Sequence, residues 1–145
     1  MNRLQLAVRD NRFQEVQTFV DEGDDIYTRN VEYTSKTLLH IAAISDCDPE
    51  IVTFLIGRGM KVNEKDRHGN TPLHHATTNF SLKMVKHLLY HGADPNITND
   101  NGLKPIDLIV PIIYWAKKRT INLEHSEDIH YLLAGDEEIK EPECE

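Results

Sequence analysis

The strongest constraint on this chain is a short unit that recurs along it. Three glycines, Gly23, Gly59 and Gly92, are spaced 36 and 33 residues apart, and each follows an apolar run at helical spacing: "EVQTFV", "EIVTFLI" and "MVKHLL". A second pattern precedes each run: "LQLAV", "TLLHIAA" and "TPLHHAT". A fourth copy, "KPIDLIV", begins 33 residues after the third. A unit this short cannot bury its apolar face alone, so the pattern predicts units stacked against their neighbours.

Each unit is predicted to form two short helices. Thr37 and Thr71 offer N-cap oxygens, and Pro72 and Pro105 stand at the first helical position, where the missing N–H costs nothing. The second helix of each of the first three units is predicted to end at its glycine, which suits a C-cap. Small side chains line one face of the first helices and permit close packing; they are Ala7, Ala42, Ala43 and Ala76.

The unit resembles the ankyrin repeat, whose "T-P-L-H-x-A" pattern is matched by "TPLHHA". The third unit matches almost throughout, including "DRHGNTPLH" and "HGADPN", and the second matches with a one-residue insertion. The first and last units are degenerate, as terminal caps are. The resemblance implies an all-α ankyrin-repeat solenoid of stacked helix-turn-helix pairs with projecting β-turn loops. It covers residues 1–135, with repeats over 1–30, 31–65, 66–98 and 99–135, followed by an acidic tail over 136–145.

Size and charge narrow the possible partners. A chain of 145 residues with 39% hydrophobic content forms one modest domain. The formal charge is −8, and the tail "DEEIKEPECE" contributes −5 of it through six acids and one lysine, which leaves −3 for the rest. An acidic chain repels phosphate backbones, and the only basic cluster is Lys117, Lys118 and Arg119. We therefore expect no nucleic-acid partner.

The cysteines and the chain start bear on location. Cys47 and Cys144 lie far apart and match no metal or redox spacing, which favours a reducing compartment, the cytoplasm or the nucleus. The start "MNRLQLAVRDNR" is charged too early for a signal peptide. The run "IDLIVPIIYWA" is about half of a membrane span and contains Asp107 and Pro111. We expect no membrane association and a monomer in the free state.

The stretch "HGNTPLHHAT" raises three possibilities: a metal site, a general base, or a structural role. The histidine of this stretch recurs as His40 and His74, and the same position holds Gln5 in the first unit and Asp107 in the fourth. A catalytic histidine would not recur in this way. The ankyrin resemblance implies that this ring bonds the neighbouring threonine and the loop backbone. The residues with implied structural roles are Thr37, His40, Thr71, Pro72, His74, Gly23, Gly59 and Gly92.

The alternative class is a metal- or ligand-dependent enzyme that uses the histidine cluster. His87 and His91, four residues apart on one helix face, would form half of a zinc site, but no cysteine or carboxylate at ligand spacing completes it. No serine or cysteine stands on a recognisable nucleophile elbow. We therefore expect no catalysis, no bound metal and no cofactor.

The resemblance implies that another protein binds to the turns and first helices. The turn "TRNVEYTSK" is two residues longer than is usual for the family, and Tyr33, Arg67 and His68 are expected on adjacent turn tips. Aromatic and arginine side chains dominate interface energies, which favours Tyr33 and Arg67 as anchors. The predicted partner-binding residues are Arg29, Tyr33, Ile44, Arg67, His68, Asn70, Thr78, Asn79, Asp100, Asn101, Leu103 and Ile112.

The fourth unit departs most from the pattern. About a dozen extra residues separate "KPIDLIV" from the second helix "SEDIHYLLAG", and the segment is apolar nearly all round. Pro111 is expected to kink or end the first helix, because it lacks an N–H. We expect the inserted loop and last helix to fold back over Trp115; the alternative places Trp115 in an interface.

The sequence thus predicts a way of binding but no particular partner. The favoured function is a stand-alone inhibitor that masks a partner surface, or an adaptor. The tail lacks apolar periodicity and is expected to be disordered. It serves solubility or, as in ankyrin inhibitors of Rel-family transcription factors, occludes a basic partner surface. Short stand-alone stacks also resemble host-directed proteins of viruses and intracellular bacteria.

Overall fold

The computed structural model describes residues 1–29, 34–118 and 126–135, with the backbone only at 115–118. Several predictions concern positions outside this part: the binding role of Tyr33, the packing of the Trp115 side chain, and the disorder of the tail over 136–145. These remain predictions.

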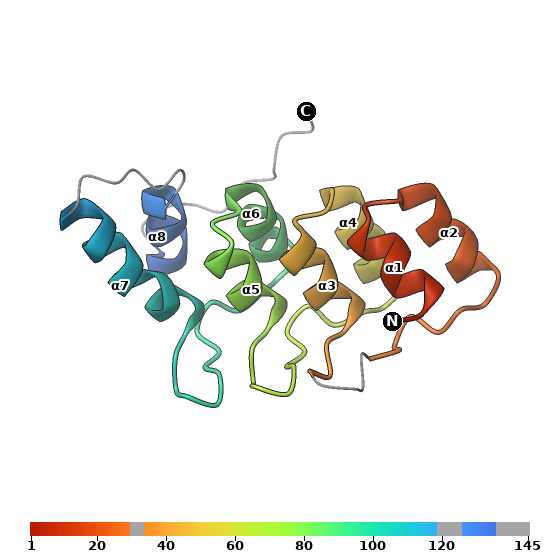
Figure 1. The fold of residues 1–145 in the computed structure, drawn as a ribbon, viewed down its shortest axis with the longest axis horizontal. Coiled ribbons are helices and arrows are strands. Elements are labelled where there is room, and N and C mark those ends of the chain that lie inside the picture. Colours follow the sequence, from red (N-terminus) through yellow and green to blue (C-terminus); the bar gives the residue numbers. More distant parts are fainter. Residues whose placement is uncertain (30–33, 119–125, 136–145) are drawn as a thin grey trace.

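The described residues contain eight helices, which are arranged in four pairs (Figure 1). Apart from a single bridged residue, Lys36, the described chain contains no β-strand. The all-α character that the sequence predicted is therefore confirmed. The helices are α1 (Arg3–Arg9), α2 (Phe13–Asp21), α3 (Leu38–Ser45), α4 (Pro49–Gly57), α5 (Pro72–Thr78), α6 (Leu82–Tyr90), α7 (Pro105–Lys118) and α8 (Ser126–Ala134).

The helices form two layers along one row. Each first helix packs against the second helix of its own repeat: α1 against α2, α3 against α4, α5 against α6 and α7 against α8. The first helices also pack against one another in chain order, α1, α3, α5 and α7, and the second helices do the same. Figure 1 shows the turns before α5 and α7 projecting on the same side of this row.

Local sequence sets where the helices begin and end. Asn2 caps α1 through its side chain, which accepts the N–H of Gln5, and Ser81 caps α6 by accepting the N–H of Met84. Pro49, Pro72 and Pro105 begin α4, α5 and α7. The second helices end before Gly23, Gly59 and Gly92, whose φ angles of 96°, 99° and 87° suit glycine better than any other residue.

The core runs through the whole row between the two layers. Ala7, Ala42, Ala43 and Ala76 are completely buried or nearly so, and they let the first helices approach one another closely. Larger side chains from both layers fill the remaining space, and those that are fully buried include Leu4, Leu39, Ile51, Leu55, Leu73, Met84, Leu88, Ile109 and Ile129. Each repeat thus buries its apolar face only because neighbours cover it.

The sequence predicted that Pro111 would kink or end the first helix of the fourth repeat. The second alternative is wrong, because α7 continues through Pro111 to Lys118. Proline removes one intrahelical hydrogen bond, to the carbonyl of Asp107. Both Asp107 and Pro111 lie on the exposed side of α7, so water can hydrogen-bond that carbonyl. The fourth repeat therefore has a first helix of 14 residues, twice the 7 residues of α5.

Candidate functional site

The candidate site lies on the surface formed by the projecting turns before α3, α5 and α7 together with those helices, which we call the inner face. Its geometry depends on one recurring contact at the start of each first helix. In all four repeats a side chain accepts the backbone N–H of the residue three positions earlier: Gln5 from Asn2, His40 from Thr37, His74 from Thr71, and Asp107 from Lys104.

We call the position of this accepting side chain the slot. His40 shows what the slot residue does inside the stack. The Thr37 N–H donates to its Nδ1 at 3.1 Å, and because an N–H can only donate, Nδ1 carries no proton. Nε2–H therefore donates to the carbonyl of Asn70, at 2.9 Å, in the next turn. Burial lowers the pKa of His40 to about 4, so the ring is neutral at pH 7. One neutral ring thus bonds α3 to the turn of the third repeat.

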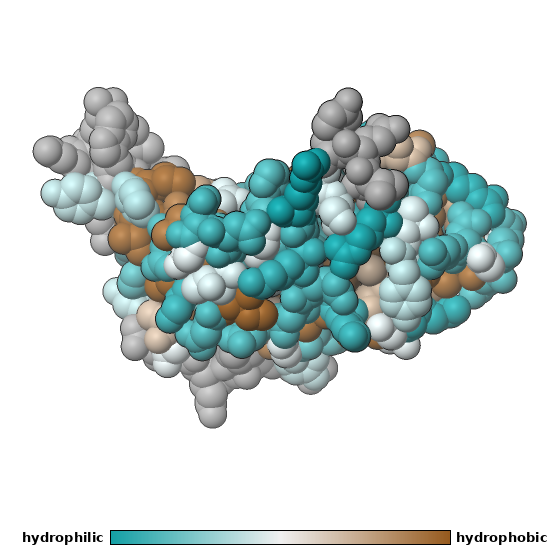
Figure 2. All heavy atoms as spheres, turned by 90° about the horizontal axis from the view of Figure 1, so that it is seen from below, coloured by the Kyte–Doolittle hydropathy of each residue, from teal (hydrophilic) through white to brown (hydrophobic). Residues whose placement is uncertain are grey.

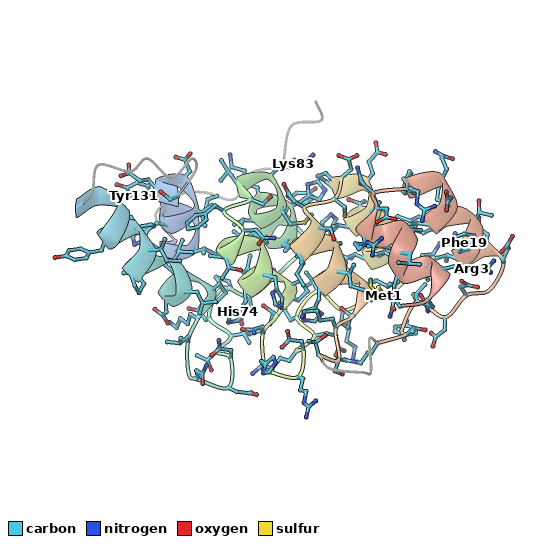
Figure 3. The ribbon with its side chains drawn as sticks, viewed as in Figure 1. Met1, Arg3, Phe19, His74, Lys83 and Tyr131 are labelled. Atoms are coloured by element: carbon cyan, nitrogen blue, oxygen red, sulfur yellow. The ribbon has the colours of Figure 1, made fainter. Side chains whose placement is uncertain are left out.

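His74 repeats this arrangement one repeat later (Figure 3). The Thr71 N–H donates to its Nδ1 at 3.1 Å, and its Nε2–H donates at 3.0 Å to the carbonyl of Leu103 in the fourth turn. Burial lowers its pKa as well. Both histidines have all their ring nitrogens occupied, which leaves neither free to act as a base or metal ligand.

Asp66 organises the turn of the third repeat. Its Oδ1 accepts the N–H groups of His68 and Asn70 at 2.9 and 3.0 Å, and its Oδ2 accepts from Nε2 of His75 at 2.9 Å. Burial alone would raise the pKa of Asp66, but these hydrogen bonds outweigh it and hold the pKa below its ordinary value. Burial lowers the pKa of His75 although Asp66 acts against it. Because Nε2–H donates to Asp66, Nδ1 is the acceptor of the neutral ring, and it forms no hydrogen bond within the described residues.

Backbone hydrogen bonds join the tips of successive turns. The N–H of Arg67 donates to the carbonyl of Thr34 at 2.9 Å, and the N–H of Asp100 donates to the carbonyl of His68 at 3.0 Å. The amide of Asn99 donates to Oδ1 of Asn70 at 3.0 Å. The turns of repeats two, three and four are thereby held in a row.

A polar cleft of about 390 Å³ opens between the third and fourth turns. The sequence predicted four of its lining residues, and the fold brings them together. Within the described part of the chain, the side chains of His68 and Asn101 and the Nδ2 of Asn70 form no hydrogen bond, which leaves them available to a ligand. The lining residues are His68, Asn70, His74, His75, Thr78, Asn99, Asn101 and Leu108.

Other predicted residues divide into exposed and structural ones. Arg29 contacts Glu64 at 2.5 Å and donates to the carbonyls of Ser35 and Lys65, so it holds its turn against the next. The Asn79 amide donates to the carbonyls of Ala43 and Ile44. The sequence did not indicate these contacts. The exposed residues of the predicted set include Ile44, Arg67, Asp100, Leu103 and Ile112.

Sequence reasoning missed four lining or organising residues: Asp66, His75, Asn99 and Leu108. Two of them carried a usable signal, because an Asp or Asn followed three residues later by Gly is typical of a turn that the side chain closes. Asp66 precedes Gly69 and Asn99 precedes Gly102 in this way. His75 and Leu108 follow the recurring slot, and no signal in the sequence distinguishes them.

The second helices carry the His87 and His91 pair. Nε2 of both rings lies near the Thr53 hydroxyl, at 3.1 and 3.2 Å. Among the described residues, no three histidine, cysteine or acidic side chains are grouped to hold a metal ion. Cys47 is buried, and burial raises the pKa of its thiol to about 12, which makes it a poor nucleophile. Nor does any helix in the described ranges have the length and apolar character needed to cross a membrane.

The chain is a repeat solenoid, because its helix pairs lie in a row and are joined through equivalent turns and a recurring slot. A family model for ankyrin repeats, covering three copies, matches residues 4–99. The chain belongs to the ankyrin-repeat family. Ankyrin repeats are protein–protein interaction modules, and the family is in general not enzymatic.

The chain is similar to segments of several different kinds of protein. The chain is 33% identical to human protein phosphatase 1 regulatory subunit 27 over 123 residues, which cover 75% of this chain and 79% of the relative. It is 30% identical to a putative ankyrin repeat protein of fowlpox virus, over 86% of this chain and 39% of that protein. It is 42% identical to the mouse B-cell lymphoma 3 protein homolog over 54% of the chain, but only 17% of that protein. The chain likewise spans only 9% of an Arabidopsis GTPase-activating protein that it matches.

Proposed function

We propose that this protein binds a partner protein through its inner face and acts on that partner as an inhibitor or an adaptor. The observation that carries the proposal is the cleft between the third and fourth turns. Its walls are fixed by internal hydrogen bonds, yet His68, Asn101 and Nδ2 of Asn70 keep unused hydrogen-bonding groups. A rigid surface of this kind loses little conformational entropy on binding.

The chemistry of the inner face suits a polypeptide. Asn101 offers a donor and an acceptor, and Nδ1 of His75 offers an acceptor, which together match the N–H and C=O groups of a peptide backbone. Arg67 is exposed on the tip beside the cleft and forms no ion pair within the described residues. It is therefore free to pair with a carboxylate of the partner.

Two further observations support a regulatory role without catalysis. One relative is a regulatory subunit of a protein phosphatase, and this chain spans 79% of its length. The histidines of the recurring slot have both ring nitrogens bonded, which leaves them no catalytic use. We also propose a reducing compartment, the cytoplasm or the nucleus, on the basis of cysteine number and spacing.

The experiment has two stages and uses the full chain. Affinity capture followed by mass spectrometry identifies the partner, and titration calorimetry then measures the dissociation constant for variants. Arg67→Ala and Asn101→Ala should each weaken binding by more than about 1 kcal/mol, or about fivefold, if the inner face is the interface. Their melting temperatures should match the wild type, since neither side chain forms a hydrogen bond or ion pair within the described residues.

Lys86→Ala on α6 is the matched control, because Lys86 is also exposed but lies on a second helix. It should bind with wild-type affinity. If Lys86→Ala weakens binding while both inner-face variants bind normally, the partner uses the second helices and the proposal fails.

A further inference from the structure

Within the described residues, one face of α7 has no neighbouring helix over it, and a comparison of the repeats shows this. Val8, Ala43 and Thr77 occupy equivalent positions in the first helices of repeats one to three, and all are completely buried. The equivalent residue of repeat four, Val110, is 43% exposed. In the first three repeats the first helix packs against the next first helix.

The uncovered residues form one stripe along α7. Asp107, Val110, Pro111 and Tyr114 are spaced three or four positions apart, so they share a face of the helix, and all four are exposed. Tyr114 is 68% exposed. Figure 2 shows apolar side chains gathered at the end of the molecule that α7 forms. We call these four residues the end stripe.

The end stripe is poorly suited to another repeat of the same kind. Inside the stack the slot histidine donates from Nε2 to a carbonyl of the following turn. Asp107 fills this slot in α7, and a carboxylate can only accept. A following turn would therefore bring a carbonyl against an acceptor. The end stripe needs an occupant that is apolar at its centre and offers a donor to Asp107.

We propose that a second copy of this chain covers the end stripe, with the two α7 helices packed antiparallel about a two-fold axis between Val110 and Pro111. In this register Val110 and Pro111 of the two copies meet at the centre. Asp107 lies opposite Tyr114 of the partner subunit, because both are equally far from the axis. The Tyr114 hydroxyl then donates to the Asp107 carboxylate, which also accepts the N–H of Lys104, and the symmetry forms this bond twice.

The pairing continues the interfaces already present. It would cover the position of Val110 with a helix, as α5 and α7 cover the equivalent residues of α3 and α5. The end stripe shares no residue with the lining of the cleft between the third and fourth turns, so the pairing does not depend on the proposed function. It differs from the monomer expected from the sequence, which stays a prediction.

Sedimentation velocity of the full chain over a concentration series tests the proposal. The wild type should convert from monomer to dimer as concentration rises. Val110→Glu should weaken dimerisation at least about tenfold, because it places a charge at the apolar centre. Tyr114→Phe removes only the hydroxyl and should weaken it about tenfold, since two hydrogen bonds are lost per dimer.

Two controls match these changes in exposure and chemistry. Ile44→Glu alters an apolar side chain that is 41% exposed on α3, and Tyr27→Phe alters a tyrosine that is 62% exposed. Both should dimerise like the wild type. In an Asp107→Ala background, Tyr114→Phe should have no further effect, because the partner of the hydroxyl is already gone. Circular dichroism confirms that each variant stays folded.

Three results would overturn the proposal. One is a wild-type chain that stays monomeric up to about 1 mM. Another is a dimer that Val110→Glu leaves intact. The last is a dimer that Ile44→Glu disrupts, since that outcome would place the contact on the inner face instead.

Discussion

The first helices of repeats three and four occupy equivalent places in the stack, yet their outward faces differ. In α5, His74 and Thr77 are buried against the next repeat, and the ring of His74 bonds the carbonyl of Leu103. In α7 the equivalent residues, Asp107 and Val110, are exposed. The same local motif therefore stabilises the stack where a neighbour covers it and offers a contact surface where none does. Position in the array, rather than the motif itself, decides the role of the slot.

The largest expected effect is a loss of folding stability on acidification, caused by the buried slot histidines. Below pH 6.5 the unfolded chain protonates His40, whereas the folded chain does so only near pH 4. The stability that the neutral ring contributes is complete above pH 6.5 and is lost as the pH falls to about 4. The loss should reach about 3 kcal/mol, measured by urea unfolding at a series of pH values. Asp66 and His75 lie near this ring and contribute to the profile.

A matched variant isolates His40 in that experiment. His40→Gln keeps a polar side chain that the same slot holds in repeat one as Gln5. Its stability should change less between pH 6.5 and 4 than that of the wild type. Equal slopes for the two proteins would assign the acid sensitivity to other groups.

Truncation of the slot residue should lower the free energy of unfolding more in repeat three than in repeat four. His74→Ala leaves the carbonyl of Leu103 without its donor and opens a cavity, so it should cost about 2 kcal/mol in the free energy of unfolding. Asp107→Ala removes an exposed N-terminal contact of α7 and should cost about 0.5 kcal/mol. Chemical denaturation of the two variants side by side measures the difference. Equal losses would mean that burial does not control the role of the slot.

The smallest expected difference is between alanine substitutions at two equivalent glycines. Gly69 and Gly102 occupy equivalent turns with the same φ of 74°. A Cβ at Gly69 would lie 2.7 Å from the backbone nitrogen of Asp100, whereas a Cβ at Gly102 meets nothing within 4 Å. Gly102→Ala should cost about 1 kcal/mol for the left-handed backbone, and Gly69→Ala should cost about 1 kcal/mol more. Thermal melts of both variants test this, and a smaller loss for Gly69→Ala would contradict the close packing of the turns.

The sequence predicted the fold closely and the site in part. Thr71, Pro72 and His74 identified where α5 begins, because capping and proline placement act within a few residues. The lining residues His68, Asn70, Thr78 and Asn101 were found from their place in the repeat. Arg29 and Asn79 were taken for free positions, because their hydrogen bonds join residues some 35 positions apart, which no local pattern reveals.

The sequence by itself determined the repeat length, the helix pairs and the slot at the start of each first helix, since these follow from helix periodicity and capping over short distances. Only the tertiary structure decided which faces are covered. It showed that α7 continues past Pro111, that His75 lines the cleft, and that the end stripe is exposed. Burial depends on contacts between repeats about 33 residues apart, so equivalent sequence positions can have different surroundings and different roles.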